Sequence, residues 1–298
     1  MKQKLFTIIV ALLCTLNLNA AVSYKDGLLP GVFLAAPDKP IKFAQGNLQN
    51  QDSLWRLADN QYTVLNKNNP ADGAIDRFPW SEPNYWGEHA IVNGGNEENM
   101  WRTLTKNEWD YLLMRRPDAA SLVGLGRVDG HNGLFLLPHE WETPDDVPYF
   151  NNVYEKGFSI TDEYYMSEWD FHYDDNEYTL EEWTLMEAAG AVFLPAVGTH
   201  GLYWSSSLHD NDDSYAHAFH FDIVNGEGSE YLNYIWPYGG KPLTDTYSVR
   251  LVRDYTPGPE TGMENTAQTV QSKKILRDGQ LLIIRGDKLY NAQGAEIK

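Results

Sequence analysis

Cysteine is almost missing from this chain. The single cysteine among its 298 residues is Cys14, which lies in an apolar run near the N-terminus. One thiol cannot form a disulfide within the chain or act as half of a redox pair. Because Cys14 is expected to leave with a signal peptide, the mature chain has no disulfide and no thiol chemistry, and packing has to stabilise the fold.

Basic residues are also scarce. The chain has 23 Lys and Arg against 42 Asp and Glu, which gives a formal net charge of −19. A surface with this excess of negative charge repels nucleic acid and anionic membranes, so we expect neither as a partner. The charge is typical of a protein kept soluble outside the cell, and cation binding is the alternative.

The N-terminus has the pattern of an export signal. Lys2 and Lys4 precede an apolar run over residues 5–16, and Ala20 and Ala21 follow it. The run is too short to span a bilayer, whereas this order of charge, apolar run and small residues is typical of a signal peptide. We predict a signal peptide over residues 1–20, an extracellular or outer-surface location, and no membrane insertion of the mature chain.

Aromatic residues are plentiful, with 10 Trp, 18 Tyr and 11 Phe. Many of them stand among polar and acidic neighbours instead of in apolar runs. Flat rings with a polar edge supply a large contact area at low entropic cost. The composition therefore favours recognition of a carbohydrate or a protein.

Short apolar segments recur along the chain, each bounded by Gly or Pro. They cover residues 101–105, 133–138, 190–196, 203–207 and 248–252. Each has the length of a buried strand, and the polar stretches between them are predicted to be loops. This division indicates a rigid core that carries long surface loops.

Two helices are marked by capping boxes. Thr105 is followed by Glu108 and Thr179 by Glu182, the spacing of reciprocal side-chain caps. Further strands are expected at residues 31–36, 41–44 and 216–221, with a pair at 55–57 and 61–64, while 66–99 is expected to be loop. Two helices with short antiparallel strands and long loops predict an α+β fold.

The ordered segments, together with residues 43–49 and Trp55-Arg56, resemble the Fibrobacter succinogenes major paralogous domain family over residues 28–254. The resemblance implies an exported protein with a C-type-lectin-like fold, and it implies no particular ligand. The family is distantly similar to formylglycine-generating enzymes. Those enzymes bind copper through paired cysteines, which the mature chain lacks, so that activity is excluded.

The C-terminal part is predicted to be separate. A C-type-lectin-like domain over residues 21–256 would be followed by a linker over 257–272, which opens with Pro257-Gly258-Pro259. Residues 273–298 then form a small β tail, with a hairpin around Asp278-Gly279. This tail resembles a short type IX sorting domain, and the alternative is a hairpin that packs on the main domain.

No motif for catalysis or for a resident metal stands out. The triplet Glu82-Pro83-Asn84 is similar to the calcium and sugar ligands of C-type lectins, but it lies upstream of the first capped helix. Carboxylates also cluster over residues 162–177 and at Asp210, Asp212 and Asp213, without EF-hand spacing. Zinc-ligand spacing and a nucleophile elbow are absent. We therefore expect no enzyme and no cofactor, with calcium as the alternative.

The histidines are scattered, and the spacing of His217 and His220 predicts opposite faces of a strand. The candidate binding surface is the segment between the last two core strands, residues 206–247. Its proposed ligand contacts, with the strand residue before it, are Trp204, His209, Asp210, Tyr215, Tyr231, Tyr234, Trp236 and Tyr238.

These aromatic side chains either form an exposed platform or fill the core beneath a long loop. On the first view the chain is a secreted or cell-surface, non-catalytic binding protein for a glycan or a protein. The alternative is a structural or adhesin-type component of the cell surface or of an appendage tip.

Overall fold

The computed structural model describes residues 24–145, 147–150, 154–158, 162–166, 176–223, 234–256, 273–277, 280–285, 288–291 and 296–297. The predicted signal peptide and linker lie outside these residues. The chain divides into two compact units, Met1–Tyr255 and Thr256–Lys298. In the smaller unit, four strands pair antiparallel in sequence order: β18 (Lys273–Arg277), β19 (Gln280–Arg285), β20 (Lys288–Asn291) and β21 (Glu296–Ile297).

The chain is dominated by strands, with 39% strand and 17% helix, so the predicted α+β class with two helices is wrong. One reason is that residues 208–215 and 234–242 were expected to be loop, apart from the strands predicted at 203–207 and 216–221. Much of this sequence is instead part of long paired strands. These strands are β13 (His200–His209), β14 (Asp212–Asp222) and β15 (Tyr234–Pro242).

In the larger unit, the sheet that contains these strands has the order β13-β14-β15-β10-β9 and ends with β10 (Asp162–Met166) and β9 (Tyr154–Phe158). A second sheet has the order β1-β2-β17-β6, formed by Phe33–Leu34, Pro40–Phe43, Leu251–Asp254 and Arg102–Thr103. A third has the order β11-β7-β8-β12, formed by Glu177–Tyr178, Val123–Val128, His131–Leu136 and Val192–Pro195.

Two further sheets of the larger unit have two strands each. β3 (Leu48–Gln51) pairs with β4 (Leu54–Leu57), and β5 (Phe78–Pro79) pairs with β16 (Thr246–Tyr247). The predicted pairing of residues 55–57 with 61–64 is wrong, because Gln61 is buried and bonds through its side chain to Phe193 N–H. The expected loop over residues 66–99 is interrupted by β5 and by the short helix α2 (Tyr85–Glu88).

Both predicted capping boxes are confirmed. Thr105 and Glu108 cap α3 (Lys106–Asp110), which widens into a π-helical turn at Tyr111–Arg115. Thr179 and Glu182 cap α4 (Leu180–Ala188) in the same way. Single turns of 3-10 helix occur at Lys25–Gly27, Pro70–Asp72 and Ala119–Leu122.

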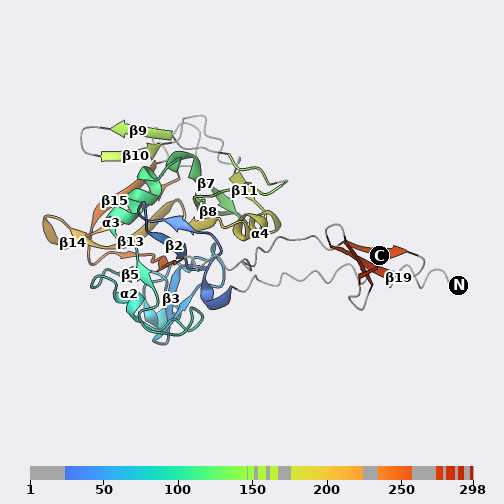
Figure 1. The fold of residues 1–298 in the computed structure, drawn as a ribbon. Helices are drawn as coiled ribbons and strands as arrows, with labels where there is room; N and C mark the ends of the chain where they lie inside the picture. The colour runs from blue at the N-terminus through green and yellow to red at the C-terminus, as the bar shows by residue number, and fades with distance from the viewer. Residues whose placement is uncertain are drawn as a thin grey trace. The chain divides into compact units, whose positions relative to one another are not determined.

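Three clusters of buried apolar side chains lie between these elements. The cluster that matters most for the site joins α3 to β14, since the Trp109 and Phe219 rings stack with centroids 4.9 Å apart. Figure 1 shows α3 beside the sheet that contains β13, β14 and β15. The helix therefore starts at a fixed point next to that sheet.

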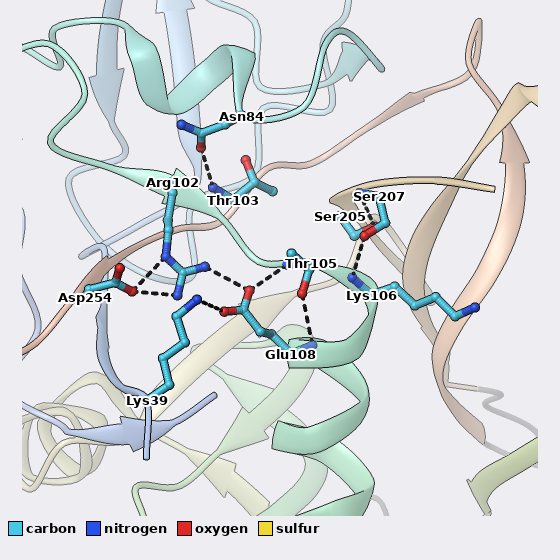
Figure 2. Close-up of polar contacts among 10 residues, drawn as sticks. All are labelled: Lys39, Asn84, Arg102, Thr103, Thr105, Lys106, Glu108, Ser205, Ser207 and Asp254. Carbon is cyan, nitrogen blue, oxygen red and sulfur yellow. Dashed lines mark hydrogen bonds and ion pairs between the residues drawn. The ribbon is translucent and has the colours of Figure 1, made fainter. Parts of the chain in front are cut away.

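The N-terminus of α3 is held by an ionic network (Figure 2). The Glu108 carboxylate is almost buried, and it pairs with Lys39 Nζ at 2.7 Å and with Arg102 Nη1 at 2.8 Å. It also accepts the Thr105 N–H at 2.8 Å. Burial raises the pKa of Glu108, but these three donors outweigh it and hold the pKa below its usual value.

We expect Glu108→Gln to lower the free energy of unfolding near neutral pH by about 2 kcal/mol, because two cations lose their shared carboxylate. A carboxylate with a lowered pKa stabilises the fold above its unfolded pKa, and this contribution disappears as the pH falls through the lowered value. The variant should therefore lose less stability on acidification than the wild type. Urea unfolding at about pH 7 and about pH 3 measures this, with the exposed Glu82→Gln as control. A deficit of the same size at both pH values would contradict the assignment.

Candidate functional site

A pocket of about 620 Å³ is lined by residues of β13, β14 and β15. One lysine of α3, Lys106, reaches it from the side. The remaining walls come from the three strands and the turn after β13: His200, Leu202, His209, Asp210, His217, His220, Asp222, Trp236, Tyr238, Gly239, Gly240 and Lys241.

His217 and His220 both line this pocket, although their spacing predicts opposite faces of the strand. Alternation continues along β14, because the consecutive buried residues Ala218 and Phe219 belong to different core clusters. The register with β15 shifts at the same point, so that Ala218 faces Gly239 and His220 faces Trp236. The extra residue on β15 is a β-bulge.

Lys106 is placed by the start of α3. Its backbone N–H donates to Ser207 Oγ at 3.1 Å, and its side chain extends away from the Glu108 network (Figure 2). Lys106 Nζ then pairs with Asp210 Oδ2 at 2.9 Å and lies 4.8 Å from the centre of the Tyr238 ring. The hydrogen bond and charge of Lys106 lower the pKa of Asp210, so this exposed carboxylate stays ionised.

His217 lines the pocket beside two other aromatic rings. Its ring is 5.1 Å from the His209 ring and meets the Tyr238 ring edge-on at 6.0 Å. Its side chain is 5% exposed, and neither ring nitrogen has a hydrogen-bond partner among the described residues. Burial, aided by the charges of Lys106 and His209, lowers the pKa of His217 to about 4.

His220 and Trp236 form the second half of the pocket, with ring centroids 5.0 Å apart at 70°. Burial lowers the pKa of His220 to about 4, and the Lys241 charge adds to this effect. At neutral pH both imidazoles are therefore uncharged, and each ring offers one N–H donor and one nitrogen acceptor. Nearby, His200 Nδ1 pairs with the Asp222 carboxylate.

Four of the predicted contacts, His209, Asp210, Trp236 and Tyr238, line the pocket. Tyr215 lies at its edge, with its ring 6.4 Å from that of His209.

The other three predicted contacts are Trp204, Tyr231 and Tyr234. Trp204 is completely buried, donates from Nε1 to Phe78 O at 2.7 Å and does not reach the pocket. Tyr234 belongs to β15, but its side chain is outside the description, and Tyr231 lies outside the described residues.

The predicted contacts did not include nine pocket residues, namely Lys106, His200, Leu202, His217, His220, Asp222, Gly239, Gly240 and Lys241. One signal was available, because period-2 alternation along the strand predicted at residues 216–221 places His220 and Asp222 on the same face. No local signal connects Lys106 with a sheet that begins about a hundred residues later.

No metal centre is formed by the residues that the structure describes, because none of their His, Cys, Asp and Glu side chains gather in threes around a common point. The Glu82-Pro83-Asn84 triplet has a backbone role at its last residue: Asn84 Oδ1 accepts the Thr103 N–H at 3.1 Å (Figure 2). The carboxylates of residues 162–175 have side chains outside the description.

Comparison with known proteins identifies no relative: no family model, no curated protein and no solved structure matches the chain. The resemblance to the paralogous domain family therefore remains a prediction. Among the described residues, no helix has the length and apolar character needed to cross a membrane.

We expect the His217 and His220 rings to titrate with midpoints of about 4 in imidazole NMR spectra of the folded chain. Because the unfolded rings bind protons near 6.5, stability should fall as the pH drops from that value toward 4. His217→Gln should reduce this loss, since it removes one of the two groups. The exposed His131, outside the pocket, serves as the reference signal. Midpoints near 6.5 for both rings would show that the pocket does not desolvate them.

Proposed function

We propose that the chain is a secreted or cell-surface, non-catalytic binding protein that holds a glycan in the pocket on β13, β14 and β15. The observation that carries the proposal is the placement of two aromatic rings, Trp236 and Tyr238, beside carboxylate and imidazole groups in one cavity. Its volume of about 620 Å³ lies within the range of small-ligand sites.

Sugars have an apolar C–H face and an edge of hydroxyl groups. An aromatic ring packs against the first, and polar side chains bind the second. The ionised Asp210 accepts hydroxyl hydrogens, whereas the neutral ring of His217 both donates and accepts. His217 has ring nitrogens without a partner among the described residues, so a bound hydroxyl would supply the missing bond.

The same groups favour binding over catalysis. A general acid or base works best when its pKa lies near the working pH. Here the pKa values of His217 and His220 are both lowered to about 4, and that of Asp210 is lowered as well. A glycosidase needs one carboxyl group whose pKa is raised, and Asp210 is held in the opposite direction.

Trp236→Ala should weaken glycan binding by about tenfold or more, because it removes one ring face from the pocket. Glycan-array screening of the full chain finds the ligand, and calorimetry measures the loss. Trp141→Ala removes a tryptophan outside the pocket and should leave the affinity unchanged. Near-UV circular dichroism checks that both variants are folded. Equal affinity for Trp236→Ala and the wild type would exclude this face as the binding surface.

A second candidate function, self-association as a structural surface component, is favoured by an apolar patch on the β3-β4 hairpin and its neighbours. Leu54 and Val92 are 59% and 47% exposed, and Tyr85 packs edge-on against Trp55 beside them. The Val92 N–H donates to Trp55 O at 2.9 Å, which joins the two segments. Contiguous exposed apolar side chains are typical of protein interfaces.

If this patch is an interface, the full chain should form oligomers in sedimentation velocity and Leu54→Asp should shift it to monomer, because a buried unpaired charge opposes association. Leu185→Asp makes the same change at an exposed leucine of α4 and should leave the oligomer intact. A wild-type chain that stays monomeric at all concentrations tested would eliminate the structural role for this patch.

A further inference from the structure

We infer that the glycan bound in this pocket is uncharged and that it is released when the histidines of the pocket take up protons. This inference rests on the proposed function, and it specifies the class of sugar and the response of binding to acid. Both parts follow from one property of the pocket, namely that its charges cancel only while its imidazoles are neutral.

The charged side chains of the pocket are evenly matched. Its lining contains two lysines, Lys106 and Lys241, and two aspartates, Asp210 and Asp222. Lys106 Nζ pairs with Asp210 Oδ2 at 2.9 Å, and Lys241 and Asp222 have opposite effects on the pKa of His220. A charged ligand would bring into the closed site a charge that this set does not balance, which costs binding free energy. An uncharged sugar leaves the balance intact.

The histidines make this balance depend on pH. Four of the eight histidines of the chain line the pocket: His200, His209, His217 and His220. An imidazole is charged only when it is protonated. Each proton bound here therefore adds positive charge to a pocket whose two carboxylates already face two ammonium groups. The balance that suits an uncharged sugar exists only while the rings are neutral.

His217 connects protonation with the ligand contacts. Its Nε2 atom lies 3.9 Å from Asp210 Oδ2, the same oxygen that accepts from Lys106 Nζ. The groups that face its ring are Lys106 of α3, His209 of β13, Asp210 of the following turn and Tyr238 of β15. A protonated ring cannot accept a hydroxyl hydrogen, and its charge attracts Asp210. The sugar then loses two acceptors at once.

His220 acts in the same direction. The charged and titratable groups near it are Lys241 of β15 and Asp222 of its own strand, with which His200 of β13 pairs. The pKa values of His217 and His220 are both about 4, so each ring is half protonated at that pH. If the sugar binds only when both rings are neutral, about one quarter of the protein is competent at about pH 4, and the apparent affinity falls about fourfold.

The first test compares charged glycans with their neutral counterparts on the full chain at about pH 7. The array carries oligogalacturonate and its carboxyl-reduced form, sialylated oligosaccharides and their desialylated forms, and sulfated oligosaccharides with their unsulfated forms. We expect binding to neutral members and at least tenfold weaker binding to the matched charged ones.

The second test measures the neutral glycan that binds most tightly on this array, by calorimetry at about pH 7 and about pH 4. Its affinity should be about fourfold weaker at the lower pH. Titration in two buffers of different ionisation enthalpy counts the protons displaced. We expect about one proton per bound sugar at about pH 4, from two half-protonated rings, and none at about pH 7. Near-UV circular dichroism checks that the chain is folded at both pH values.

His217→Gln keeps one donor and one acceptor but does not titrate. It should reduce the loss of affinity between the two pH values to about twofold, since only His220 then remains of the two rings. His131→Gln makes the same change at an exposed histidine outside the pocket and should leave the loss at about fourfold.

The outcomes separate the two proposals. Charged glycans that bind as tightly as their neutral counterparts at about pH 7, or a neutral glycan whose affinity is the same at both pH values, overturn the inference and leave glycan binding intact. Absence of binding to every member of the array overturns the proposed function together with the inference. A neutral preference, with a loss at low pH that His217→Gln reduces and His131→Gln does not, supports both.

Discussion

The larger unit depends on the hydrogen bonds that the buried Arg250 guanidinium donates. It donates to Asn47 Oδ1 at 3.0 Å, to Ala44 O at 3.1 Å and to Phe193 O at 2.8 Å. Burial lowers the pKa of Arg250 to about 10, so the group stays charged at neutral pH. An uncompensated charge in a core costs several kcal/mol. The segments that supply these oxygens, far apart in sequence, are therefore held at one point.

This arrangement reaches the pocket through β13. Tyr203 OH accepts from Asn47 Nδ2 at 3.3 Å and donates to Pro195 O at 2.7 Å. One part of β13 is thus joined to the residues around Arg250, and its other part leads to the turn that carries Asp210. The imidazoles and aromatic rings of the pocket come from β13, β14 and β15. A preorganised binding site requires such a rigid support beneath its polar residues.

Signals between neighbours in sequence predicted where two helices begin. Contacts between residues far apart in sequence determined the strand pairing and brought the pocket residues together. The capping residues Thr105 and Thr179 fix where helices start, because that chemistry involves only neighbours in sequence. The length of β14 and β15 depends on their pairing with each other. The glycine and polar residues in these strands therefore wrongly predicted loops. His209 and Trp236, predicted as ligand contacts from their place in residues 206–247, line the pocket. Lys106 was missed because only tertiary packing of α3 brings it to Asp210.

The alternation along β14 has a further consequence. Ala218 packs in one core cluster and Phe219 in another, so this strand lies between the two clusters. A ligand that touches the His217 and His220 rings would contact the strand that joins them, and saturation would raise the melting temperature by mass action.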